Sequence, residues 1–326
     1  MAINTTTSLS GQYQRFYSKK LLQHAENTLV LNQFAKKAPL PKGLGSKTIR
    51  FFRRVTAASA NVQTLTEGTP LATYTDLTYT AVDVDLAQLG ELARFTDILG
   101  WTALLDVMED GIQLLGEDCA LKADDVTLAV LAHATTGATK RYSGGQTTYA
   151  GLAALTQTTG KFIATDALDA VTNLKINLAP RVNGGYIGII GPQVARDLMV
   201  DARWLDPQKY KDGTDGLFKG EIGKLDGVRY VETTNVWSED ATEGTRDITI
   251  TPADQIYSTF FTGKDAYGVV ALDGQSPMSP KVMICDKPDK SDGLNQFISV
   301  GWKAFYNAAV LNAAWVINVR SLAQYS

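Results

Sequence analysis

The sequence predicts a mixed α+β fold for a chain of 326 residues. Residues 96–133 carry apolar side chains at steps of three and four, the period of an amphipathic helix. Several shorter segments, among them 48–55, 186–190 and 255–261, have the β-branched and aromatic composition of strands. With 44% apolar and 20% charged residues, the composition is that of a folded globular protein that can bury a large core.

The first 54 residues are strongly basic. They hold ten Lys and Arg and a single acidic residue, Glu26, which leaves about −12 on the rest of a chain whose net charge is −3. Loosely helical spacing of apolar residues over 12–37 predicts an arm that contains a helix, and a Pro- and Gly-rich stretch at 39–45 ends it. Such an arm suits either the phosphates of packaged DNA or an acidic face of a neighbouring copy.

A long hairpin is predicted next, with strands at 48–55 and 74–86 and with Thr66-Glu67-Gly68-Thr69-Pro70 in the connection. A two-stranded ribbon is only marginally stable in water, so we expect the hairpin to lean on another surface. That surface is either an adjacent subunit or the hairpin's own domain.

The amphipathic period at 96–133 predicts a helix that would be roughly 50 Å long if unbroken. Further along the chain we expect helices at 166–177 and 193–200, and strands at 186–190, 245–251 and 255–261.

Near the C-terminus, apolar residues alternate from Ala309 to Val319, with Asn312, Asn318 and Arg320 on the other set. This alternation predicts one last strand with a single apolar face. Its burial would bring the chain back to a core that it left earlier, so the middle segment is interpreted as an insertion.

The residues that usually carry chemistry are sparse, and we expect no catalytic residue, cofactor or metal site. Cys119 and Cys285 are far apart and are predicted to be buried free thiols, while His24 and His133 lack a second ligand at metal spacing and are predicted to be structural. The Gly-rich stretch at 43–48 lacks the spacing of a phosphate-binding loop, and 212–216 lacks the full pattern of a calcium loop.

The N-terminal residues lack the features of a secretory signal, and no run of about 18 apolar residues occurs in the chain. We therefore expect a protein that is soluble where it is made and has no membrane partner.

Two separated blocks resemble one known family. The first runs from Leu217 to Val236 and contains Gly220-Glu221-Ile222-Gly223, Gly227-Val228-Arg229 and Glu232-Thr233-Thr234-Asn235. It resembles the major capsid proteins of tailed bacteriophages, in the family typified by the coliphage N-four shell protein. The second block resembles the closing segment of the same proteins, and it contains Leu294-Asn295-Gln296, Gly301-Trp302-Lys303 and Leu311-Asn312-Ala313-Ala314-Trp315.

The resemblance implies a Hong Kong 97-like fold from about Thr48 to Arg320. Its implied parts are an N-terminal arm at 1–46, an extended hairpin loop at 47–92, a peripheral domain with a long spine helix at 93–160, an axial domain at 161–293 and a C-terminal return strand to the peripheral domain at 294–326. From periodicity alone, the long helix is equally a plain core helix.

The implied role is structural and not enzymatic. Hexamers and pentamers of the chain would close into an icosahedral shell that encloses double-stranded DNA without sequence specificity. The shell would belong to the virion capsid, assemble in the host cytoplasm and include a portal protein, with scaffolding or decoration proteins as further candidates. The alternatives are another virion component, such as a tail or decoration protein, and an enzyme with a composite site.

The residues expected at subunit contacts are charged. They are Arg50, Arg53, Arg54 and Glu67 in the hairpin, and Glu221, Lys224 and Arg229 in the axial domain. The alternative for each is an ordinary solvated surface charge.

Overall fold

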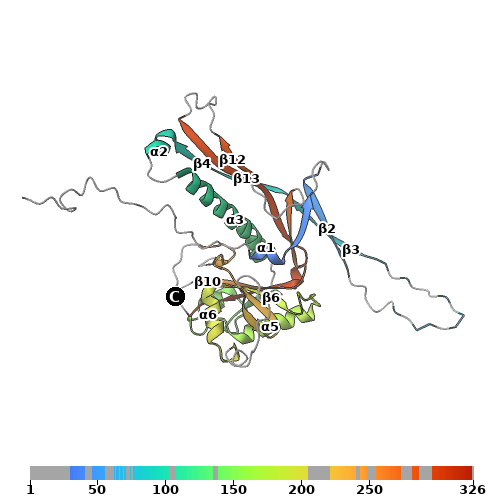
Figure 1. The fold of residues 1–326 in the computed structure, drawn as a ribbon. Helices are drawn as coiled ribbons and strands as arrows, with labels where there is room; N and C mark the ends of the chain where they lie inside the picture. Colours follow the sequence, from blue (N-terminus) through green and yellow to red (C-terminus); the bar gives the residue numbers. More distant parts are fainter. Residues whose placement is uncertain are drawn as a thin grey trace, which may run out of the picture.

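The computed structural model describes residues 30–40, 46–55, 62, 64–65, 67–68, 70, 74, 76–102, 107–134, 139–204, 221–239, 243–247, 255–272, 281–285 and 296–324. These residues form an elongated lobe, a compact lobe and a two-stranded ribbon that projects from the elongated lobe (Figure 1). Among the helices they form, none is both long and apolar enough to cross a membrane.

A five-stranded sheet and one long helix build the elongated lobe. The central strand is β13 (Phe297–Val310); on one side it pairs with β4 (Ala87–Thr96), and on the other with β11 (Tyr267–Leu272) and β12 (Lys281–Cys285). Strand β1 (Lys36–Leu40) adds to β11 in parallel. Helix α3 (Val107–Ala134) packs on this sheet through apolar residues at helical spacing, which include Leu115, Cys119 and Ala123. The helical prediction at 96–133 is confirmed by α2 (Asp97–Thr102) and α3, and residues 103–106 lie outside the described residues.

The compact lobe is built on a seven-stranded sheet. Its order is β5 (Lys140–Tyr142), β14 (Val316–Ser321), β10 (Ile256–Thr262), β6 (Tyr186–Ile190), β8 (Val228–Glu232) and β7 (Glu221–Leu225), with β9 (Ser238–Glu239) beside β10. Helix α5 (Ala164–Ile176) packs on the sheet, and α4 (Tyr149–Ala153) and α6 (Pro192–Val200) complete the lobe. All residues of β6 and β10 are buried because both faces of these central strands are covered. The predicted strands at 186–190 and 255–261 and the predicted helices at 166–177 and 193–200 are confirmed.

The two lobes share one apolar core. Leu128 and Leu131 of α3 pack in one cluster with Ile187, Ile189 and Phe260 from the sheet of the compact lobe. The N-terminal half of α3 lies on one sheet and its C-terminal half contacts the other, so this helix fixes how the lobes are joined.

The ribbon consists of β2 (Thr48–Arg54) and β3 (Tyr79–Asp85), paired antiparallel as predicted. At its base, Phe51 and Val84 are buried against Val270 and Leu311 of the elongated lobe. The ribbon therefore leans on its own lobe at the base, whereas side chains on its other face are exposed.

The structure describes residues 30–37 of the helix predicted over 12–37. For the residues that follow Phe34, the helical prediction is wrong. Helix α1 spans only Leu31–Phe34, and Lys36–Leu40 form strand β1. The pairing of this segment with β11 overrides its local helical spacing, as tertiary contacts commonly do. Residues 12–29 lie outside the described residues.

The single C-terminal strand predicted over 309–319 is also wrong. Strand β13 ends at Val310, a 3₁₀ turn spans Ala313–Trp315, and β14 then enters the other sheet. The backbone N–H groups of Leu311 and Asn312 both donate to the carbonyl of Ala266, and Ala314 N–H donates to Asn312 Oδ1, which turns the chain between the sheets. Strand β14 is buried on both faces, so its polar residues are inside the lobe, and residues 296–324 contribute to both lobes.

Two further differences concern strands. In the described part of the strand predicted at 245–251, only Arg246 makes a single bridge, to Glu239, and 248–251 lie outside the described residues. Strands β4, β5, β9, β11 and β12, and the first part of β13, had no prediction.

A buried polar cluster anchors the segment around α1 to α3 and the sheet. The Val30 N–H donates to Asp124, Tyr267 donates to the Leu31 carbonyl at 2.5 Å, and Tyr306 donates to Asn32 Oδ1 at 2.6 Å. Burial raises the pKa of the Asp124 carboxyl to about 7, although the Val30 N–H acts in the opposite direction. A carboxyl group that is 4% exposed thus holds the start of the described chain.

We predict that Asp124→Asn raises the free energy of unfolding at pH 8 and has little effect at pH 4. The folded-state pKa of Asp124 lies above the unfolded value of about 3.9, so the wild-type protein loses stability as pH rises between these values, by at most about 1.4 kcal/mol per pH unit from this group. Urea unfolding of the unassembled chain at both pH values measures the difference. An Asp124→Asn variant with the same pH slope as the wild type would contradict this account.

Candidate functional site

Within the described parts of the chain, no three His, Cys, Asp or Glu side chains are grouped as metal ligands. Cys119 is buried, as predicted, and burial raises the pKa of its thiol to about 11. His133 is structural, as predicted: its Nδ1 lies 2.7 Å from the Ala129 carbonyl, and its ring contacts Trp237 edge to face. His24 and the Cys285 side chain lie outside the described residues.

The hairpin group of predicted contact residues lies on the projecting ribbon. Arg50 makes a two-pronged ion pair with Asp83, with Nε to Oδ1 at 2.6 Å and Nη2 to Oδ2 at 2.7 Å. Arg54 and Glu67 are exposed and Arg53 is half-buried. Asp83 was not among the predicted residues, although it lies directly opposite Arg50 in the strand register.

Seven large apolar side chains of the ribbon and of the described part of its connection are exposed. We name this set the ribbon surface, and it comprises Phe52, Val55, Val62, Leu65, Tyr74, Leu77 and Tyr79, all between 44% and 81% exposed. Large apolar side chains that a projecting segment exposes to water are candidates for an interaction surface. The sequence analysis selected charged residues of the hairpin and therefore missed this surface. The contacts at the ribbon base show that Phe51 is buried and Phe52 is exposed.

The second predicted group lies at the edge of the compact lobe. Strand β7 ends the sheet and carries Glu221 and Lys224, and Lys224 pairs in register with Arg229 of β8. Lys224 is exposed and Arg229 is half-buried. The structure thus brings Lys224 and Arg229 together, and it places this group and the hairpin group on different sheets.

A polar cluster ties α3 to the compact lobe, and we name it the interlobe cluster. It comprises Asp125, Asn235 and Arg246: Asp125 Oδ1 accepts from Asn235 Nδ2 at 2.9 Å and from Arg246 Nη1 at 2.6 Å, and Arg246 also donates to Asn235 Oδ1. Asn235 closes the sequence block that resembles phage capsid proteins, so part of that block has a structural role in joining the lobes. Neither Asp125 nor Arg246 was predicted.

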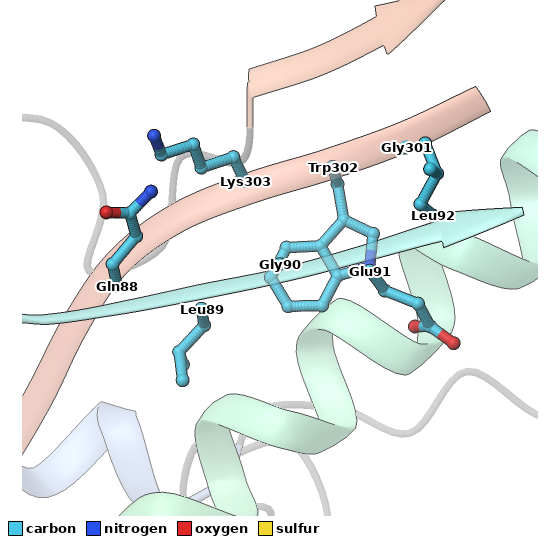
Figure 2. A pocket seen from close by; sticks show the side chains of 8 residues that line it. All are labelled: Gln88, Leu89, Gly90, Glu91, Leu92, Gly301, Trp302 and Lys303. Carbon is cyan, nitrogen blue, oxygen red and sulfur yellow. The ribbon is translucent and has the colours of Figure 1, made fainter. Parts of the chain in front are cut away.

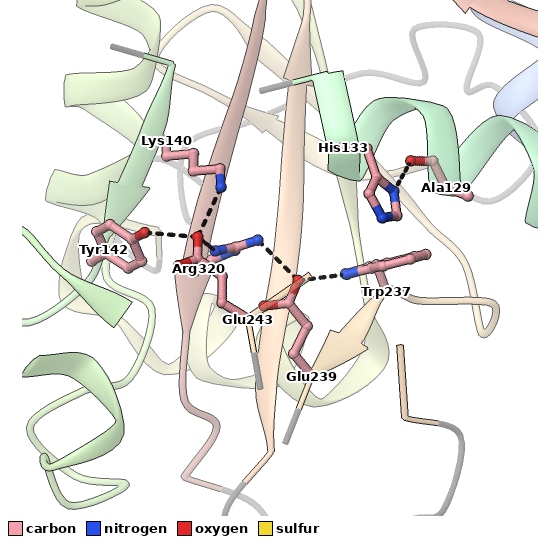
Figure 3. A network of polar contacts seen from close by, with 8 residues as sticks. All are labelled: Ala129, His133, Lys140, Tyr142, Trp237, Glu239, Glu243 and Arg320. Carbon is pink, nitrogen blue, oxygen red and sulfur yellow. Dashed lines mark hydrogen bonds and ion pairs between the residues drawn. The ribbon is translucent and has the colours of Figure 1, made fainter. Parts of the chain in front are cut away.

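A second cluster surrounds Arg320 inside the compact lobe (Figure 3). Its guanidinium group donates to Glu239 at 2.9 Å and to Glu243 at 2.5 Å; Glu243 also accepts from Lys140 at 2.8 Å, and Trp237 donates to Glu239 at 2.7 Å. The hydrogen bond from Lys140 and the nearby Arg320 hold the pKa of the Glu243 carboxyl below its usual range. Because the side chains of Arg320 and Glu239 are at most 1% exposed, their charges depend on each other.

We predict that Arg320→Met lowers the free energy of unfolding by about 3–5 kcal/mol, since it leaves the Glu239 carboxylate buried without its cation. Arg320→Met combined with Glu239→Gln should recover much of this loss. Urea unfolding gives the comparison, with exposed Arg141→Met as a control that changes stability by about 0.5 kcal/mol or less. A single Arg320→Met variant as stable as the control would refute the role assigned to the pair.

The chain matches the model of one protein family, described as phage capsid protein, over residues 125–282. This match includes the first of the two sequence blocks and the interlobe cluster. No curated protein sequence matches the chain significantly.

Solved structures with the same fold cover nearly the whole chain. The capsid of Ralstonia phage GP4 is 13% identical, covers 96% of both chains and has a TM-score of 0.72. The capsid protein of cyanophage P-SCSP1u is 17% identical over 98% of this chain and 96% of its own, with a TM-score of 0.67. The encapsulin SrpI of Synechococcus elongatus PCC 7942 is 11% identical over 100% and 99% of the two chains, with a TM-score of 0.60.

The fold predicted from the resemblance is therefore confirmed. The matching family model describes phage capsid proteins, the same class that the two sequence blocks indicated. The chain has the Hong Kong 97-like fold of phage capsid structures, and its residues 125–282 match the phage capsid protein family, which supports its interpretation as a structural major capsid protein.

Proposed function

We propose that many copies of this chain, arranged as hexamers and pentamers, close into an icosahedral shell that encloses double-stranded DNA in the virion. The observation that carries the proposal is the ribbon surface, because an isolated chain leaves these large apolar side chains in water. A neighbouring copy that covers them would remove this cost.

A closed shell needs one chain to make several different contacts with its copies. In this subunit the two lobes share an apolar core and the interlobe cluster, whereas the described residues of the ribbon pack on the elongated lobe at the ribbon base. We infer that the lobes act as the constant body and that the ribbon adapts to each neighbour.

Under this proposal the sequence-derived parts keep their roles: an arm at 1–46, an extended loop at 47–92, a peripheral domain at 93–160, an axial domain at 161–293 and a closing segment at 294–326. Contacts with a neighbour involve Arg50, Arg53, Arg54 and Glu67 of the ribbon, and contacts around the capsomer axis involve Glu221, Lys224 and Arg229. Assembly takes place in the host cytoplasm, with a portal protein and with scaffolding or decoration proteins as partners. The role is structural and not enzymatic.

We predict opposite effects for the neighbouring residues Phe51 and Phe52. Phe52→Ser removes an exposed side chain, so the unassembled chain should keep its stability within about 0.5 kcal/mol while shell formation falls sharply. Phe51→Ala should lower stability by about 3 kcal/mol because Phe51 is buried at the ribbon base. Urea unfolding and size-exclusion chromatography measure the two properties, and normal shell yield from Phe52→Ser would argue against the ribbon surface as an interface.

Deletion of residues 63–73 should leave a folded chain that forms no shells, because the deletion shortens the ribbon beyond its buried base. Circular dichroism and negative-stain electron microscopy test the two parts of this prediction. Normal closed particles from the deletion variant would remove the ribbon end from the assembly mechanism.

A further inference from the structure

The edge of β4 carries a groove that the proposed function does not use. Strand β4 bonds to β13 along one edge, and its other edge pairs with no strand that the structure describes. A cavity of about 540 Å³ is lined by Gln88 to Leu92 and by Gly301 to Lys303 of β13 (Figure 2). A second cavity, of about 410 Å³, is lined by Leu89 to Glu91 of β4, by Trp302, and by Asp118, Leu121, Lys122 and Asp125 of α3. We name the second cavity, between β4 and α3, the β4 groove.

One buried donor in the groove has no acceptor. Trp302 is 5% exposed and its Nε1 makes no hydrogen bond. Figure 2 shows its ring between the sheet and α3, with the ring nitrogen on the side of Glu91. An indole N–H that is buried without an acceptor is costly, so a ligand that brings a carbonyl oxygen would be stabilised here.

The groove is also acidic. Glu91 and Asp118 line it, and neither forms an ion pair with another described residue, whereas Asp125 is held by Arg246. Lys122 is the one basic side chain among the α3 residues of the lining. Over its whole length α3 holds six acidic residues against this single lysine.

These three features together select the chemistry of the occupant. An open strand edge binds the backbone groups of another extended segment. A metal ion would leave the Trp302 N–H without an acceptor, and the carboxylates would repel the phosphates of DNA. A basic peptide segment satisfies the strand edge, the indole and the carboxylates at once.

We propose that the β4 groove binds the basic N-terminal segment of its own chain, around Arg15, Lys19 and Lys20. Residues 12–22 hold these three cations and no acid. The described chain starts beside α3, where the Val30 N–H donates to Asp124, and Asp118 lies six residues earlier, about 9 Å along the helix axis. The ten residues from Lys20 to Val30 reach up to about 35 Å when extended.

The tether favours the own-chain segment over that of a second copy. A short linker holds the segment at an effective concentration of order millimolar near the groove, well above the micromolar concentration of dilute free chains. The inference concerns a single subunit, so it stands or falls independently of shell formation.

Carbodiimide cross-linking of the full-length, unassembled chain tests the proposal, since the reagent joins only amines and carboxylates that are in contact. An equal mixture of ¹⁴N- and ¹⁵N-labelled chains should give links from Lys19 or Lys20 to Glu91 or Asp118 in peptides of one isotope. The Lys140 and Glu243 pair, at 2.8 Å, supplies an internal positive control in every sample.

Variants give a second readout, the rate of tryptic cleavage after Arg15, Lys19 and Lys20. Glu91→Gln with Asp118→Asn should speed this cleavage roughly fivefold, as expected for the loss of two weak ion pairs. Trp302→Phe, which keeps a ring and removes the N–H, should also speed it, whereas Asp169→Asn on α5 should not change it.

Each other outcome overturns the proposal. Links that combine both isotopes would place the segment on a neighbouring copy. If the Lys140–Glu243 link forms and the links from Lys19 or Lys20 do not, the segment does not occupy the groove. Loss of the links on addition of duplex DNA, with the control link intact, would make DNA the preferred partner.

Discussion

The packing of α3 against both sheets is the constraint on which the rest of the structure depends. Its N-terminal half buries Leu115 and Cys119 on the sheet of the elongated lobe, and its C-terminal half buries Leu128 and Leu131 against the compact lobe. The buried cluster around Asp124 and the interlobe cluster at Asp125 are on consecutive residues of the same helix. A shift of α3 would therefore disturb the attachment of α1, the join between the lobes and the floor of the β4 groove together.

A buried ion pair fixes the strands of the compact lobe relative to one another. Arg320 and Glu239 lie fully inside the compact lobe, where their separation from water is offset by their ion pair and by hydrogen bonds from Trp237 and to Glu243. Such groups tolerate few alternative geometries, so they favour one relative position of β9, β14 and the chain near Glu243. A constant subunit body of this kind is compatible with a shell in which variation is confined to projecting segments.

Local sequence patterns predicted the elements whose own residues determine their structure. The periods of α3 and α5 and the apolar runs of β6 and β10 were read correctly because burial of these elements follows directly from composition. Lys36–Leu40 was missed because a distant strand, β11, decides its conformation, and the turn after Val310 because it depends on the Ala266 carbonyl. Arg50 was predicted, but Asp83, Asn235 and Arg320 acquire their roles only through partners far away in sequence.

The central claim is that this subunit forms a closed shell through surfaces that the isolated chain exposes. Electron microscopy of the purified wild-type chain, with size-exclusion chromatography of the same sample, tests it most directly. The account predicts hollow closed particles of uniform diameter in equilibrium with free subunits. A chain that remains monomeric at every concentration and salt condition, or that forms only open tubes, would contradict it.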